Sequence, residues 1–109
     1  MRTLKFIVDD QIIIRDPYCD FDNLVPGTDG YVRAEFECSQ EWTGCVRVAQ
    51  FKSLMGREFE PQLLIDGRSC IIPAEALEKR IFKVGLIGKG NEYTITSNFV
   101  KVYQNGGKG

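Results

Sequence analysis

The chain has 109 residues, with 14 basic and 15 acidic side chains, a net charge of −1 and no histidine. The length predicts one domain with a buried core, and the near balance of charge argues against a general nucleic-acid binder. Without histidine, Ser-His and Cys-His nucleophile pairs are excluded and the commonest metal ligand is missing. The apolar runs are too short to cross a bilayer, and the N-terminus lacks the apolar core of a signal peptide.

Alternation of apolar and polar residues predicts four strands in the first half of the chain, over residues 4–8, 11–15, 31–38 and 45–51. The turn over residues 39–44 carries Trp42, which has two interpretations. The indole is either an exposed platform for a sugar or a protein partner, or a plug over the open end of the core. Because large aromatic side chains are mostly buried, the plug is preferred.

Residues 16–30 are rich in turn-forming Asp, Pro and Gly, and they predict the longest loop. Asp16, Asp20 and Asp22 have a spacing that could hold calcium, but the loop lacks the glycine and the bidentate glutamate of known calcium loops. Cys38 and Cys45 flank the 39–44 turn, so a disulfide between them stays open, although reduced thiols are the default in the cytosol. No Cys-x-x-Cys pair is present, and we expect no metal site.

The strongest local signal is the pair of apolar runs over residues 62–65 and 68–72, separated by Asp66-Gly67. A two-residue turn of this kind needs positive φ at both central positions, and Asp-Gly adopts that conformation at little steric cost. The pattern predicts a β-hairpin with a type I′ turn.

The second half of the chain predicts one short helical piece over residues 73–79, which crosses from one sheet to the other. Strands follow over residues 81–87, 92–96 and 99–103. If Val100 and Val102 face the core, then Phe99, Lys101 and Tyr103 face outward and form a partner surface, with strand addition as one binding mode. A last strand buried on both faces is the alternative.

Together these elements predict an all-β fold: an immunoglobulin-like sandwich of two antiparallel sheets with one short helical crossover. No linker divides the chain, so we expect a single β-sandwich domain over residues 1–104 and a flexible C-terminal tail over residues 105–109.

The order of several motifs resembles short proteins from phages and prophages of Gram-positive bacteria, similar to tail, baseplate and receptor-binding-fibre components. The matching motifs are Ser39-x-x-Trp42-x-Gly44, Asp66-Gly67-x-x-Cys70-x-Ile72-Pro73-x-Glu75, Phe82-x-Val84 and Ile95-Thr96-x-Asn98. The resemblance implies a β-sandwich attachment module without a fibre or receptor-binding region. It also implies a non-enzymatic structural or accessory protein of the virion, made in the bacterial host cytoplasm, that docks onto another protein in several copies.

Two other function classes stay open. One is a small phage-encoded inhibitor that blocks a host anti-phage defence protein, for example an anti-CRISPR. The other is a carbohydrate-binding module that uses Trp42 and neighbouring tyrosines. All three readings need a binding surface, with no catalytic residue, cofactor or metal, and no direct contact with a membrane or nucleic acid. The candidate partner-binding residues are Phe99, Lys101, Tyr103 and Trp42. The partner's identity and the oligomeric state, homo-oligomer included, are left open.

Overall fold

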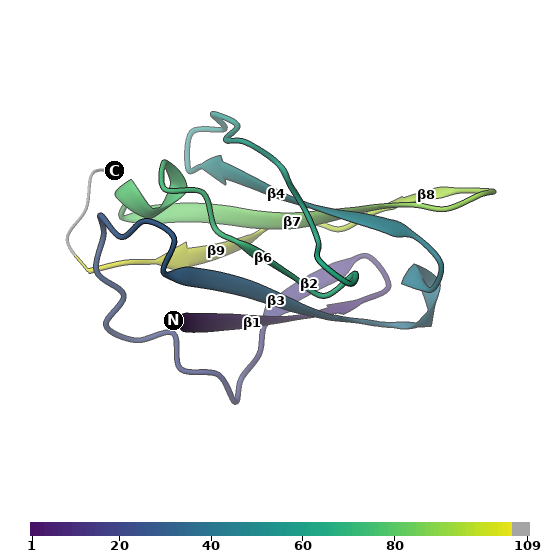
Figure 1. Ribbon diagram of the computed structural model, residues 1–109, viewed down its shortest axis with the longest axis horizontal. Coiled ribbons are helices and arrows are strands. Elements are labelled where there is room, and N and C mark those ends of the chain that lie inside the picture. Colours follow the sequence, from purple (N-terminus) through teal and green to yellow (C-terminus); the bar gives the residue numbers. More distant parts are fainter. Residues whose placement is uncertain (106–109) are drawn as a thin grey trace.

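The computed structural model describes residues 1–105. In this range, nine strands form two sheets that pack face to face, and two short 3-10 turns lie in the connections between strands (Figure 1). Sheet A has the order β2-β1-β3-β6, with bounds Ile12–Arg15, Arg2–Asp9, Val32–Cys38 and Ser69–Ile71. Sheet B contains β4 (Val46–Ser53), β5 (Gln62–Leu63), β7 (Ile81–Lys89), β8 (Thr94–Thr96) and β9 (Val100–Tyr103). The predicted all-β sandwich is therefore confirmed as a two-sheet β architecture.

Strand β7 organises sheet B. It pairs with β4 along one edge, while β8 and β9 share its other edge, β8 near the end of β7 and β9 near its start. Alternate residues of β7 face the core: Phe82, Val84 and Leu86 are fully buried. The residues between them, from Ile81 to Ile87, therefore face outward, because successive side chains of a strand point to opposite faces.

The prediction that all strands pair antiparallel is wrong for β1 and β3. These two strands run parallel, with Leu4 opposite Ala34 and Phe6 opposite Phe36. The reason lies in the connection, because β2 and the long loop return the chain to the end at which β1 begins. There the backbone N–H of Arg2 donates to the carbonyl of Tyr31 (2.9 Å), so β3 starts beside the start of β1.

The predicted turn at Asp66-Gly67 is confirmed, since both residues have positive φ (53° and 66°). The predicted hairpin is wrong beyond that turn. Only one bridge, Ile65 to Ser69, joins the two arms, because β5 pairs with β4 in sheet B and β6 pairs with β3 in sheet A. The turn therefore links the two sheets along one side of the sandwich.

The predicted helical crossover is confirmed in position, between β6 of sheet A and β7 of sheet B, as a 3-10 turn η2 (Ala76–Glu78). The buried side-chain amide of Gln104 donates to the carbonyls of Leu77 (2.9 Å) and Lys79 (2.8 Å), which ties the end of β9 to this crossover. Of the predicted tail, residues 106–109 lie outside the described residues. Asn105 is anchored, because its N–H donates to the carbonyl of Leu24 (2.7 Å).

Candidate functional site

Two of the predicted partner residues, Lys101 and Tyr103, lie exposed on the outer face of sheet B. Their neighbour Val102 is fully buried and Val100 packs against the core, so the predicted alternation of β9 is confirmed. The alternative of a strand buried on both faces is excluded, since about half of the Tyr103 side chain faces solvent (51% exposed).

Trp42 does not belong to this surface. It ends the 3-10 turn η1 (Gln40–Trp42) and is completely buried, and its Nε1–H donates to the carbonyl of Asp10 (2.7 Å). The ring lies against Gly88 so closely that a Cβ at Gly88 would come within 2.8 Å of its Cε3. The exposed-platform interpretation of Trp42 is therefore wrong and the plug is confirmed, because the indole fills the space that Gly88 leaves free at one end of the core.

Phe99 precedes β9 and is half-buried on the outer face of sheet B. Its ring covers Gly85 in the centre of β7, where an added Cβ would lie 2.8 Å from the ring. The ammonium of Lys52 lies 3.8 Å from the centre of the same ring, a cation–π contact. Phe99 thus has a structural role, and it also sets the position of one lysine.

Three lysines line up across the outer face of sheet B. Lys83 of β7 lies opposite Lys52 of β4 on one side and opposite Lys101 of β9 on the other. Residues directly opposite in an antiparallel pair have neighbouring side chains on the same face, and like charges in these positions are destabilising. We call Lys52, Lys83 and Lys101 the basic row.

No lysine of the basic row forms an ion pair among the described residues, although one carboxylate lies beside the row. Among the described residues, the ion pairs within 4.0 Å are Arg2–Asp20 and Arg57–Glu75, and neither involves the row. Glu58 forms an isolated bridge with Lys52, but the Lys52 ammonium lies over Phe99 instead. The outer face of sheet B therefore carries three neighbouring lysines and one carboxylate, Glu58, on a chain whose net charge is −1.

Sequence reasoning missed Lys52 and Lys83. The predicted strand over residues 45–51 ends one residue before Lys52, whereas β4 continues to Ser53. Lysines on the outward positions of separate strands look like ordinary solvated residues until the register is known. The available signal was the alternation itself, which put Lys83 on the face opposite Phe82 and Val84.

An apolar strip crosses the same face four residues away from the basic row along β4 and β7, with the Gln50–Gly85 pair between them. Val48 lies opposite Leu63 of β5 on one side and opposite Ile87 of β7 on the other. Leu63 is 64% exposed, and Val48 and Ile87 are half-buried. We call these three residues the apolar strip. The outer face of sheet B thus combines three lysines with exposed apolar surface, and exposed apolar surface rimmed by polar residues marks protein-binding sites.

A small depression opens beside Phe99. It measures about 80 Å³, well below the roughly 300–1,000 Å³ of sites for drug-sized molecules. Its walls are formed by Gln50, Phe51, Lys52, Glu58, Phe59, Pro61 and Phe99. Its size suits a single side chain of a partner better than a metabolite or a cofactor.

A larger hollow on sheet A, of about 540 Å³, is lined by residues that include Arg33, Glu35, Asp66 and Arg68. Its side chains include two arginines and two carboxylates, so positive and negative charges are mixed in its lining. This balance distinguishes the hollow from the basic row.

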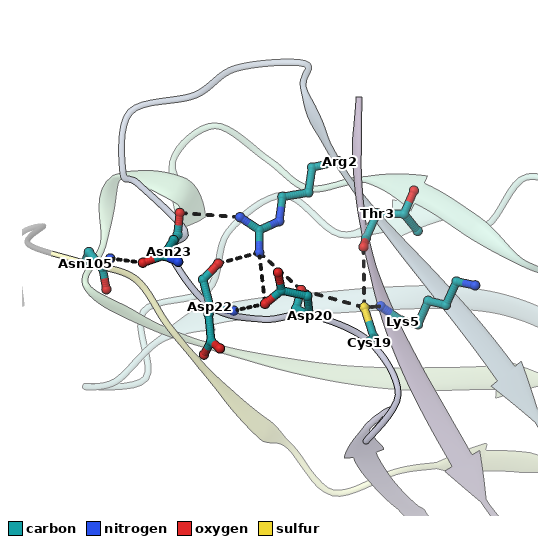
Figure 2. Close-up of polar contacts among 8 residues, drawn as sticks. All are labelled: Arg2, Thr3, Lys5, Cys19, Asp20, Asp22, Asn23 and Asn105. Carbon is teal, nitrogen blue, oxygen red and sulfur yellow. Dashed lines mark hydrogen bonds and ion pairs between the residues drawn. The ribbon is translucent and has the colours of Figure 1, made fainter.

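The aspartate-rich loop over residues 16–30 is held in place by the cationic side chain of Arg2 (Figure 2). The guanidinium of Arg2 donates to the carbonyls of Asp20 (3.1 Å), Asp22 (2.6 Å) and Asn23 (3.4 Å). The amide of Asp22 in turn donates to the Asp20 carboxylate (2.7 Å). These backbone oxygens therefore already have a cationic partner, which supports the turn-forming interpretation of the loop over calcium binding.

The cysteines are free thiols, including Cys38 and Cys45. Burial raises the pKa of Cys70 to about 12 and also raises the pKa of Cys38, an effect that the nearby Arg47 partly offsets. A raised pKa keeps a thiol protonated at neutral pH, and the thiolate is the nucleophilic form. Neither thiol is thus prepared for nucleophilic chemistry.

Comparison with protein-family models, with curated proteins and with solved structures finds no match. The resemblance to phage tail and baseplate modules therefore stays a prediction from the motifs alone. Within residues 1–105, the structure contains no helix with the length and apolar character needed to span a bilayer.

Proposed function

We propose that this chain is a non-catalytic docking module that binds another protein through the outer face of sheet B. The observation that carries the proposal is that the basic row and the apolar strip share the outer face of sheet B, to which Phe99, Lys101 and Tyr103 also belong. A row of like charges costs stability, and stability given up at a surface is expected where that surface has a binding role.

The proposal includes the absence of catalysis, cofactor and metal. It is supported by the lack of histidine in the sequence and by the raised pKa of Cys38 and Cys70. The depression beside Phe99 has room for a side chain but not for a metabolite of ordinary size.

As its place of action we propose a phage particle, with the chain made in the host cytoplasm and incorporated into the tail or baseplate. The motif resemblance supports this part, as it supports the finer description of the fold as immunoglobulin-like. The parallel pairing of β1 and β3 departs from the antiparallel sheets of that fold. Mass spectrometry of purified virions tests the location: presence at a fixed copy number supports it, and absence favours the defence-inhibitor alternative.

The docking function is tested by comparing two surfaces of one protein. The variant Leu63→Ser/Tyr103→Ala removes two exposed apolar side chains from sheet B, and Ile14→Ser/Tyr31→Ala removes two of similar exposure elsewhere. Each tagged protein is expressed in the host, and the co-purified partner is quantified against wild type. We expect loss of the partner with the sheet B variant and retention with the control. Retention with both variants would contradict the proposal.

The carbohydrate-binding alternative relied on an exposed Trp42 together with neighbouring tyrosines, and it loses its central residue because the indole is fully buried.

A further inference from the structure

We infer that the partner presents an acidic segment to sheet B, with carboxylates that meet the basic row and one short apolar side chain that enters the depression beside Phe99. This inference rests on the proposed docking function and specifies its chemistry. The occupant is a protein segment and not a nucleic acid, because a carboxylate, Glu58, lies beside the lysines and the Phe99 ring is already covered by Lys52.

The geometry of the basic row sets the spacing of the partner's charges. Adjacent strands lie about 4.8 Å apart, so the three lysines are distributed over roughly 10 Å across β4, β7 and β9. Lys52 is held over Phe99, whereas Lys83 and Lys101 have no ion-pair partner among the described residues. In an extended segment, side chains on one face recur about every 6.8 Å. Alternate carboxylates of such a segment match the reach of Lys83 and Lys101.

The depression beside Phe99 determines where the partner's acidic segment would bind on sheet B. Phe99 and Pro61 contribute to its walls, and Lys52 lies at the junction between it and the basic row. A volume of about 80 Å³ admits a short aliphatic side chain. Because charge attraction alone is weakly directional, an apolar anchor next to the carboxylates would determine the register of the segment.

Nucleic acid fits this surface poorly. Single strands bind by stacking bases on exposed aromatic rings, whereas Phe99 is half-buried, with Gly85 beneath it and the Lys52 ammonium over it. Glu58 stands beside the row and would repel a continuous polyanion. A protein segment with separated carboxylates avoids this repulsion.

The experiment titrates the isotope-labelled protein by NMR with three probes. The first is a capped peptide that alternates glutamate with serine around one leucine, the second is the same peptide with glutamine for glutamate, and the third is a short single-stranded DNA. We expect amide shifts at the basic row and near Phe99 with the acidic peptide only. We also expect its affinity to fall about tenfold when the salt is raised from low to above physiological, because screening weakens exposed charge pairs.

Two charge reversals on one strand give a matched comparison. Lys83→Glu lies within the basic row, and Lys89→Glu lies on the same face of β7 outside it, opposite Val46 and Thr94. We expect Lys83→Glu to weaken the acidic peptide at least about tenfold, and Lys89→Glu to change it less than about twofold. The thermal midpoint of Lys83→Glu should equal or exceed that of wild type, so that weaker binding cannot be attributed to unfolding.

Any one of three results would overturn the inference. These are binding of the glutamine peptide as tight as that of the acidic peptide, binding of the acidic peptide by Lys83→Glu as tight as by wild type, and tighter binding of DNA than of the acidic peptide. Two variants separate failure of the acidic-segment inference from failure of the docking function. If the cellular partner is lost with Leu63→Ser/Tyr103→Ala and kept with Lys83→Glu, docking stands and the acidic segment is wrong. If neither variant affects the partner, the docking function itself fails.

Discussion

Strand β7 carries two glycines, each covered by one aromatic ring, and the two pairs lie on opposite sides of sheet B. Gly88 faces inward against Trp42, and Gly85 faces outward against Phe99. An added Cβ would come within 2.8 Å of the ring in both cases, so the local geometry is the same. The surroundings differ, because the inner ring is fully buried and the outer ring shares its surface with a lysine and solvent. The same glycine–aromatic pairing thus closes the core on one side and shapes the proposed binding face on the other.

The largest expected effect is at the inner ring. Trp42→Ala should reduce the free energy of unfolding by about 3–5 kcal/mol, since it leaves a cavity at the end of the core and removes the Nε1–H bond to Asp10. Urea denaturation measures the loss. Tyr18→Ala, at a side chain that is 97% exposed, is the control and should change stability by less than about 0.5 kcal/mol. A loss at Trp42 no larger than the control would show that the indole does not close the core.

The second expected effect comes from the buried thiol of Cys70, which should make stability depend on pH at high pH. Burial raises the pKa of Cys70 from 9.0 to about 12, so between these values the unfolded thiol ionises while the folded thiol keeps its proton. Stability from this group is present below pH 9 and falls as the pH rises toward 12, by up to about tenfold in the unfolding equilibrium per pH unit. Unfolding of wild type and Cys70→Ala at pH 8 and 10.5 measures the difference. Identical pH dependence would contradict it.

Removing the outer ring, Phe99, should reduce stability less than removing Trp42. Phe99→Ala is expected to cost about 1–2 kcal/mol, because a half-buried ring loses less apolar burial than a fully buried one. A double-mutant cycle with Gly85→Ala sharpens the comparison. On wild type the added methyl collides with Phe99, and on Phe99→Ala it fills part of the space the ring left. We expect Gly85→Ala to be less harmful in the second background, and an equal cost in both would show that the ring does not cover Gly85 in solution.

The smallest effect is a gain in stability. Lys83→Glu places a carboxylate between Lys52 and Lys101 and should raise the free energy of unfolding by about 0.5–1 kcal/mol at low salt. High salt should reduce this gain. Denaturant midpoints at two salt concentrations test it, with Lys89→Glu as the charge-matched control. Destabilisation by Lys83→Glu would mean that the three lysines do not repel one another in the folded protein.

Much of this architecture was accessible from local pattern. Alternation identified the strand segments and the buried faces of β1, β3 and β9, and Asp66-Gly67 identified its turn. The hairpin and the all-antiparallel pairing failed because a turn determines only the residues it contains. Whether Leu63 and Ile71 pair with each other or with other strands depends on contacts with β4 and β3.

The candidate site residues likewise fall into those that local pattern predicted and those that only the tertiary structure placed. Lys101 and Tyr103 were predicted to face outward because a strand that buries Val102 must expose its neighbours. Trp42 was assigned as a candidate from residue type alone, and residue type does not reveal whether a ring meets solvent or a glycine of a distant strand.

By itself, then, the sequence determined the strand content, the inward and outward sides of the strands, and the conformation of one turn, because these depend on residues close together in the chain. Only the tertiary structure decided the strand order, the parallel pair and the alignment of Lys52, Lys83 and Lys101. Register between strands results from packing and hydrogen bonds among residues far apart in the chain, and periodicity within one strand carries no information about it.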